Sequence, residues 1–494
     1  MLRKAQGEGI DAGSGLPCGE QWVYSERTQL GEQTMTAYTR YHIHTESCPP
    51  IAFHPSRFVV RVGKAGLARL LLRELIHYRA NLAVVTSRPC LYGTFSGPIG
   101  GFAPRPECCV GCLRCTVEHP DFVEIRPNPD RQFVGDSYFT PDKVETILQE
   151  ASTGQIPVRG AGYRGQFGGD GWDGMWTDMS EIVRPTRDGI HGREFISTVV
   201  DLGERPGVLT FDQQGALAAT MPAGLSLPIP FLFDVPAASA ESEAMYRALA
   251  QAAERLQTLA IIPVRRMLDL GLGGASVVPL VAPAEIGALE RLASPPRMLE
   301  MDGWDSAAHA AARERFQDSA VFVRLPFEVS LLPPLRAGVR LFHLTANYHG
   351  RSGGVLTNEA IRQAHGLLVK EGLREQAVLV GSGGVITASD VSKAIICGLD
   401  AVALDTALWV ALQARFDGEC IDPASARFTL PPSSTIWAVQ RLMNLVAAWR
   451  DQMLEILGAM GLREVRRLRG EMGRVMFQAD LEREAFTGIA GFEG

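Results

Sequence analysis

Four cysteines lie within the stretch ECCVGCLRCTVEHP, residues 107–120, and three of them are spaced like metal ligands. Cys109, Cys112 and Cys115 follow the pattern C-x2-C-x2-C of a bacterial iron-sulfur loop, in which a fourth cysteine precedes a proline. Here the fourth position is His119, which also precedes a proline. Three thiolates and an imidazole suit either an iron-sulfur cluster or a zinc ion. The loop by itself leaves both metals open.

A second group of residues has the composition of a phosphate site. The run AVLVGSGG ends in Ser382, Gly383 and Gly384, and the run AVALDT ends in Asp405 and Thr406. Glycines let backbone N–H groups approach a phosphate closely, and the helical segment TASDVSKAIICG would direct its positive end toward the anion. The alternative is that these glycines serve only a tight strand-to-helix turn. We expect a phosphate-bearing cofactor at this position.

Cationic and imidazole groups follow two other apolar runs. TANYHGRSGGV carries His349, Gly350, Gly353 and Gly354, and Arg324 ends the run AVFVRL. Such groups at neighbouring strand ends could hold an anionic substrate or stabilise the negative charge of a reduced flavin.

The elements that must position these residues form a repeating pattern. Apolar runs alternate with helical segments such as SEAMYRALAQAAERL and NEAIRQAHGLLVKEG, which is typical of a (β/α)8 barrel, with ligand groups at the carboxyl ends of its strands. A doubly wound open sheet is the structural alternative. The eight runs are residues 228–233, 259–264, 276–281, 297–301, 320–325, 340–345, 377–383 and 401–405.

The flanking segments complete the expected organisation. Residues 64–79 have leucines at helical spacing, which predicts an amphipathic helix packed on a core. The expected parts are an N-terminal region (1–85), a ferredoxin-like iron-sulfur segment (86–135), a Gly-rich connection (136–224), the barrel (225–425) and a C-terminal helical extension (426–494).

Composition excludes several classes of protein. The 494 residues are 46% hydrophobic and 21% charged, as in a soluble globular protein. A net charge of -7 argues against a nucleic-acid binder, and no segment has the pattern of a signal peptide or membrane anchor. Nine cysteines in so long a chain, four of them crowded together, indicate a metal site and no disulfide framework. We expect a cytoplasmic protein.

Several separated motifs together resemble a known family. WTDMSEIVRPTRDGIHGREFISTVVDL (176–202), HGRSGG (349–354) and the long stretch 358–408 are similar to the FMN-binding domain of glutamate synthases, in its bacterial glutamate synthase-like branch. The resemblance covers roughly residues 85–494. It implies a (β/α)8 barrel that holds FMN, with the phosphate over Ser382–Gly384, Asp405 and Thr406, and the flavin edge near His349, Gly350, Gly353 and Gly354.

The chain also departs from that family. The family's three-iron cluster follows the last barrel strand, where this chain reads WVALQARFDGEC with Cys420 alone. The family's strand-5 lysine corresponds to Arg324, which keeps the charge and changes the geometry of carboxylate recognition. No glutaminase domain with an N-terminal cysteine nucleophile is expected ahead of this barrel.

The resemblance implies a flavin oxidoreductase that acts on an imine or another unsaturated, carboxylate-bearing substrate, with glutamate formation from 2-oxoglutarate and ammonia as one possibility. Arg324, His349 and Lys393 are the expected catalytic residues. The expected partners are an electron donor such as ferredoxin or a reductase subunit, a glutaminase-like subunit and further copies of the chain. The alternative is an FMN-binding scaffold subunit without turnover that accompanies a glutaminase-like or amidotransferase-like protein.

A flavin barrel without the three-iron loop needs another entry route for electrons, which favours iron over zinc at the cysteine loop. A single-cluster loop takes its last ligand from elsewhere in the chain. Cys90 is the nearest candidate, Cys48 is the second, and Cys108 should diverge from its neighbour. We expect a [4Fe-4S] cluster on Cys90, Cys109, Cys112 and Cys115, with His119 beside it and unbound.

Overall fold

The computed structural model describes residues 41–52, 54–82, 90–97, 99–156, 168–178, 196–205, 209–218 and 224–489. The chain divides into two compact units, Met1–His42 and Ile43–Gly494. All elements below belong to the second unit.

Eight parallel strands close into a barrel in the order β10-β11-β14-β15-β6-β7-β8-β9. Each predicted apolar run forms one of them, so the predicted barrel is confirmed and the open-sheet alternative is excluded. Their side chains are almost all buried, as expected for strands covered on both faces. The strands are β6 (Phe231–Phe233), β7 (Ala260–Pro263), β8 (Val277–Val281), β9 (Met298–Asp302), β10 (Ala320–Pro326), β11 (Leu341–Thr345), β14 (Val378–Ser382) and β15 (Ala401–Leu404).

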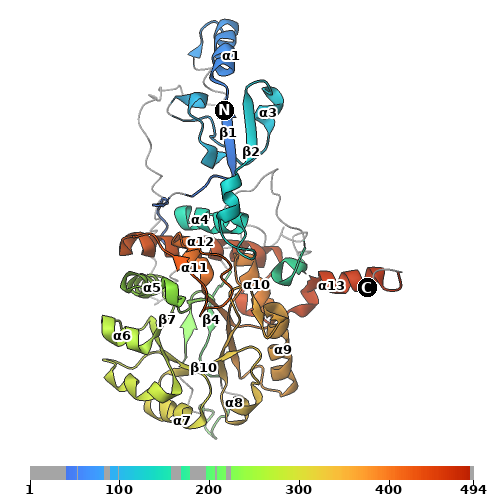
Figure 1. Ribbon diagram of the computed structural model, residues 1–494. Helices are drawn as coiled ribbons and strands as arrows, with labels where there is room; N and C mark the ends of the chain where they lie inside the picture. Colours follow the sequence, from blue (N-terminus) through green and yellow to red (C-terminus); the bar gives the residue numbers. More distant parts are fainter. Residues whose placement is uncertain are drawn as a thin grey trace, which may run out of the picture. The chain divides into compact units, whose positions relative to one another are not determined.

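Helices surround these strands (Figure 1) and follow them in sequence. Between β8 and β9, where the sequence shows no clear helical pattern, the crossover is the 3-10 helix η8 (Pro283–Arg291). The surrounding helices are α5 (Glu243–Arg255), α6 (Val264–Leu270), α7 (Ser306–Arg315), α8 (Leu332–Arg336), α9 (Thr357–Lys370), α10 (Ala388–Cys397) and α11 (Thr406–Ala411).

Strand pairing places one set of side chains on the inner face of the barrel. Arg324 of β10 lies opposite His343 of β11, and His343 lies opposite Val380 of β14. Because side chains alternate along a strand, Ser382 shares the inner face with Val380. Polar residues near the carboxyl ends of several strands therefore converge at one mouth.

The C-terminal helical extension is confirmed as α12 (Thr435–Ala459), which packs on α4 (Pro141–Thr153), α5, α10 and α11. Its fully buried Arg441 donates hydrogen bonds to the carbonyls of Cys48, Leu148 and Ala411. Burial lowers the pKa of Arg441 to about 10. One guanidinium thereby ties α4, α11, α12 and the segment that contains Cys48 together.

The cysteine-rich part is built on the antiparallel pair β1 (Phe58–Val62) and β2 (Val123–Pro127), with helices α1 (Lys64–His77) and α3 (Arg114–Glu118). Helix α1 forms where the leucine spacing predicts it. The expectation that it packs on a core is wrong, because none of its residues is buried and Leu72 is 60% exposed. Among the described residues its packing partners are the short turn η1 (Gly100–Phe102) and Phe122, which are too small to cover its apolar face.

Short two-stranded sheets complete the second unit. They join β3 (Met175–Thr177) with β18 (Val475–Phe477), β4 (Val200–Asp201) with β5 (Ser226–Leu227), β12 (Arg351–Ser352) with β13 (Val355–Leu356), and β16 (Arg415–Phe416) with β17 (Phe428–Thr429). Helix α13 (Gln478–Phe486) follows β18.

Most of the motif WTDMSEIVRPTRDGIHG, and residues 157–167 of the Gly-rich connection, lie outside the described residues. No described helix has both the length and the apolar character that crossing a membrane requires.

Candidate functional site

A buried ionic network fills the mouth of the barrel. Arg324 donates two hydrogen bonds to the carboxylate of Asp234, at 2.8 and 2.9 Å, and a third to Glu300 at 3.2 Å. Burial alone would lower the pKa of Arg324, but these carboxylates raise it above its ordinary value. Burial would likewise raise the pKa of Asp234, but Arg324 and His343 lower it to about 2. Both groups of the main ion pair are therefore charged at neutral pH.

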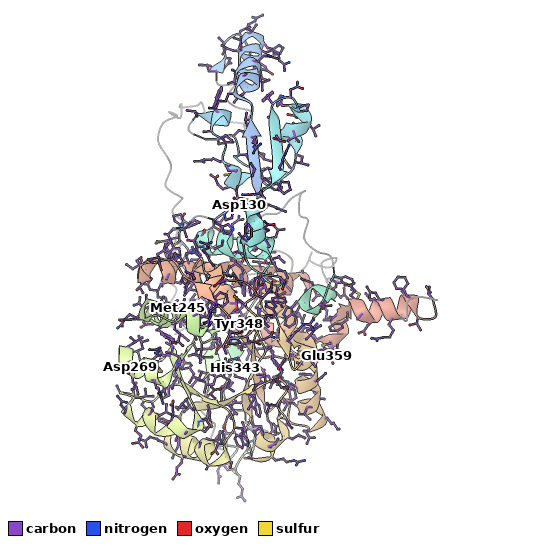
Figure 2. The ribbon with its side chains drawn as sticks, in the orientation of Figure 1. Asp130, Met245, Asp269, His343, Tyr348 and Glu359 are labelled. Carbon is purple, nitrogen blue, oxygen red and sulfur yellow. The ribbon has the colours of Figure 1, made fainter. Side chains whose placement is uncertain are left out.

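His343 extends this network across the barrel. Its Nδ1 lies 2.6 Å from Glu300 Oε1, and its Nε2 lies 3.1 Å from the hydroxyl oxygen of Ser382. His343 is fully buried. Figure 2 labels it, together with Tyr348, inside the ring of helices. The second carboxylate oxygen of Glu300 is buried and has no hydrogen-bond partner among the described residues.

The residues expected to hold a phosphate do lie together. β14 ends at Ser382, and Gly383 and Gly384 follow with φ values of 100° and 73°, which favour glycine. Beside them, the carboxylate of Asp405 accepts a hydrogen bond from the backbone N–H group of Thr406, and the N–H group of Gly383 lies close enough to lower its pKa. The buried hydroxyl of Thr406 has no partner among the described residues.

Protein atoms already surround Gly384. A Cβ at this position would stand 2.2 Å from the Cα of Gly350. The Gly384 carbonyl accepts hydrogen bonds from the Tyr138 hydroxyl at 2.6 Å and from the Trp172 indole at 2.9 Å. Gly350 thus lies beside the expected phosphate residues, and two aromatic side chains from the segment ahead of the barrel close over them.

The other predicted residues lie around this mouth. Gly353 and Gly354 form the turn between β12 and β13, with φ values of 54° and 82°. Lys393 of α10 donates a hydrogen bond from Nζ to the carbonyl of Trp172 at 2.6 Å. The Lys393 amine is thereby directed at the segment that carries Trp172.

A cavity of about 300 Å³ adjoins these residues. Arg351 lies on its wall and forms an ion pair with the exposed Asp170 at 3.0 Å. The buried hydroxyl of Thr357 has no partner among the described residues. The cavity is lined by Ser137, Tyr138, Asp170, Gly171, Trp172, His349, Gly350, Arg351, Leu356, Thr357 and Asn358.

His349 is held on the cavity wall by an ionised carboxylate. Its Nε2 lies 2.9 Å from Asp136 Oδ2, and the Tyr138 ring stacks on the imidazole with centroids 5.2 Å apart. Burial would raise the pKa of Asp136, but the hydrogen bonds from His349 and the Phe139 amide lower it. Because an ionised carboxylate only accepts, Nε2 carries the proton and Nδ1 is the ring nitrogen left for other chemistry.

Cys90 is brought to the cysteine loop. Burial first, and then the neighbouring Cys109, Cys112 and Cys90, raise the pKa of Cys115 to about 11. Burial, Cys90 and Cys112 also raise the pKa of Cys109. Besides burial, Glu107 and Cys90 raise the pKa of Cys108. Cys90, Cys109, Cys112 and Cys115 thus lie near one another, and four thiols are a donor set that suits a metal cluster.

The other candidate ligands make different contacts. The Cys48 thiol donates to the carbonyl of Trp437 on α12 at 3.6 Å. The His119 ring stacks on Phe122 with centroids 5.1 Å apart. Cys420 is buried and donates to the carbonyl of Arg427 at 3.3 Å.

Comparison with known proteins bears on the barrel. Residues 348–463 match the family model described as a conserved region in glutamate synthase. An archaeal-type glutamate synthase (NADPH) of Dehalococcoides mccartyi is 25% identical over 437 residues, which cover 74% of this chain and 86% of the relative. An archaeal glutamate synthase (NADPH) of Archaeoglobus fulgidus is 24% identical over 449 residues, which cover 73% of this chain and 84% of the relative.

The chain is therefore similar to the glutamate synthases. The region matched by the glutamate synthase model contains His349, Gly383, Gly384, Asp405 and Thr406, whereas Arg324 lies ahead of it. Among solved structures, a mandelate oxidase variant with an FMN adduct aligns at 15% identity and a TM-score of 0.36, over 55% of this chain and 87% of that chain. The barrel assignment rests on the strand pairing and not on that alignment.

The backbone donors at the mouth suit an anion, but the anion beside them is a side chain of the protein. The Asp405 carboxylate accepts from the N–H group of Thr406, and the N–H group of Gly383 also lies close enough to lower its pKa. A flavin phosphate therefore fits these amides only if this carboxylate gives way.

The sequence did not lead us to several residues of the mouth. It did not single out His343, Asp234 or Glu300 as site residues. The available signal was a charged residue at an inward position of an otherwise apolar strand, as in PFLFD and MLEMD. No comparable signal marks Asp136, Tyr138 or Trp172, which come from the segment ahead of the barrel.

Proposed function

We propose that this chain is an FMN- and iron-sulfur-dependent oxidoreductase of the glutamate synthase type. Its proposed substrate is an imine or another unsaturated, carboxylate-bearing molecule. The observation that carries the proposal is the gathering of Ser382–Gly384, Thr406, Gly350 and His349 at one barrel mouth, within or beside the region that matches glutamate synthases. Ligand groups at the carboxyl ends of barrel strands are the usual active-site arrangement of this fold.

The proposed flavin would lie against the backbone of Gly383, Gly384 and Gly350, and when bound it would supply hydride transfer to the substrate. His349 is suited to hold or accept the accompanying proton at Nδ1, because Asp136 occupies Nε2. Arg351, 43% exposed on the cavity wall, is suited to bind a substrate carboxylate. Arg324 is already bound by two carboxylates and would act by fixing the charge of the mouth.

The proposed electron entry is a [4Fe-4S] cluster on Cys90, Cys109, Cys112 and Cys115. Its support is the proximity of these four thiols, since Cys90 and Cys112 both lie close enough to raise the pKa of Cys109 and of Cys115. NADPH, acting through ferredoxin or a reductase subunit, is the proposed source of electrons, since the relatives carry it in their names. A glutaminase-like subunit would supply ammonia, and we place the protein in the cytoplasm as a homo-oligomer.

The direct test is the absorption spectrum and metal content of the purified protein, followed by flavin reoxidation with candidate substrates. We expect flavin bands with a broad iron-sulfur shoulder, and reoxidation by 2-oxoglutarate plus ammonia or by a related imine. A preparation without colour that takes up neither iron nor flavin would contradict the proposal. Zinc in place of iron would contradict the cluster alone.

One observation favours the scaffold alternative. The guanidinium of Arg324, expected to hold a substrate carboxylate, is saturated by Asp234 and Glu300. A barrel whose cation is paired internally could keep its fold for a glutaminase-like or amidotransferase-like partner without turnover. Bound flavin that no donor reduces, together with co-purification of such a partner, would support this second function.

A further inference from the structure

The side chain of Asp405 lies where two barrel strands offer backbone donors to an anion. Asp405 follows β15 and is 4% exposed. Its carboxylate accepts a hydrogen bond from the N–H group of Thr406, on its own strand end. The N–H group of Gly383, on the end of β14, lies close enough to lower the pKa of Asp405. The carboxylate thus occupies the position that a phosphate oxygen would need.

We propose that Asp405 is an internal competitor of the flavin phosphate, so that this chain binds a phosphorylated flavin tightly only when Asp405 carries a proton or is replaced. This inference rests on the proposed flavin function. It assigns to one residue the discrimination between flavins with and without a phosphate group. Such a role follows from charge, because two anions cannot share one pair of amide donors in a buried site.

The charged groups around Asp405 do not compensate its charge. Asp234, at the end of β6, opposes the ionisation of Asp405. Arg324 favours the ionisation of Asp405. Its guanidinium is already paired with Asp234 through two hydrogen bonds, however, so that it compensates the charge of Asp405 only weakly. The hydroxyl groups of Tyr348 and Tyr138 also lie within the field of Asp405 and are neutral.

Protonation of Asp405 is accessible near neutral pH. Burial, followed by the charge of Asp234, raises the pKa of Asp405 to about 7. A neutral carboxyl would remove the repulsion and could turn away from the amides. If FMN binds only when Asp405 is protonated, the fraction of the protein that can bind FMN falls about tenfold between pH 6 and pH 8.

The experiment compares FMN with riboflavin, which lacks the phosphate, by titrating the full-length protein and following flavin fluorescence at pH 6 and pH 8. For the wild-type chain we expect the Kd for FMN to rise about tenfold over this range, while the Kd for riboflavin stays constant. Asp405→Asn keeps the shape of the side chain and removes its charge. It should bind FMN at pH 8 about tenfold more tightly than the wild type and riboflavin equally well.

Two further variants complete the design. Asp269→Asn removes an exposed carboxylate from α6 (Figure 2) and should leave all four affinities unchanged. Asp405→Gly frees both amides without adding a side chain and serves if the Asn variant fails to fold, as judged by circular dichroism. The phosphate of FMN itself ionises near pH 6, and its contribution is read from the Asn variant.

The outcomes separate this inference from the function on which it rests. Equal affinity of wild type and Asp405→Asn for FMN at pH 8, or equal gains for FMN and riboflavin, would overturn the role of Asp405 and leave the flavin proposal standing. If neither the wild type nor either Asp405 variant binds either flavin, the flavin proposal fails and this inference fails with it.

Discussion

The barrel mouth and the cysteine loop are both rich in groups that could bind ligands, and they differ in how those groups are satisfied. In the mouth, Arg324 and Asp405 are held by the protein's own carboxylates and amides. In the loop, Cys112 is exposed and Cys115 has its pKa raised to about 11 with other thiols as neighbours. The main charged groups of the mouth are thus partnered by protein atoms, whereas the partner proposed for the loop thiols is a metal.

The largest expected effect is on the loop. Replacing Cys109 by Ser should abolish the iron content and the brown colour, because one of four cluster ligands is lost. Cys108→Ser is the matched control, one residue away, and should keep the full iron content. Iron analysis and the visible spectrum measure both. Cys90→Ser tests the upstream ligand, and full iron content in that variant would remove Cys90 from the set.

The next effect should be in the mouth. Arg324→Met leaves Asp234 and Glu300 as buried carboxylates without their cation, which should lower the free energy of unfolding by about 4 kcal/mol. Chemical denaturation measures the loss. The control is Arg315→Ala, whose ion pair with Glu290 is exposed on both sides and should contribute less than about 1 kcal/mol. Equal losses of unfolding free energy in the two variants would mean that the ion pairs of Arg324 with Asp234 and Glu300 contribute no more than an exposed surface pair.

An effect of similar size should appear in the pH dependence of stability. The pKa of Asp405 is raised to about 7 in the folded chain and lies near 4 when unfolded, so the folded state holds this proton more tightly. The stabilising contribution is complete below pH 4 and is lost as pH rises through 7. Asp405→Asn removes the cost of burying the charge. Relative to the wild type, it should therefore gain about 4 kcal/mol between pH 4 and pH 8 in denaturation experiments.

The smallest effect concerns the support of His349. Asp136→Asn should slow flavin reoxidation about tenfold and shift its pH profile, because the amide does not fix the imidazole tautomer as a carboxylate does. Glu419→Gln is the control, since Glu419 is half exposed and lies 3.9 Å from His349. An unchanged pH profile in Asp136→Asn would reduce Asp136 to a purely structural residue.

The sequence predicted the scaffold better than the site. All eight apolar runs became barrel strands, because buried parallel strands are continuous and apolar and their spacing is set by the intervening helices. The helix at residues 64–77 was also predictable from its period, but its burial was not. An amphipathic pattern predicts which face of a helix is apolar but not which residues cover that face. On α1, Leu72 belongs to the apolar face and is largely exposed.

By itself the sequence determined the barrel, the convergence of the Gly-rich strand ends and the spacing of three cysteines, because these depend on periods and intervals along the chain. Only the tertiary structure decided which charged side chains pair with each other. Asp136 contacts His349, 213 residues away in the sequence, and Arg324 contacts Asp234, 90 residues away. No local sequence pattern carries information over such separations. The same holds at the mouth, where the pairing of β14 with β15 brings Gly383 near Asp405.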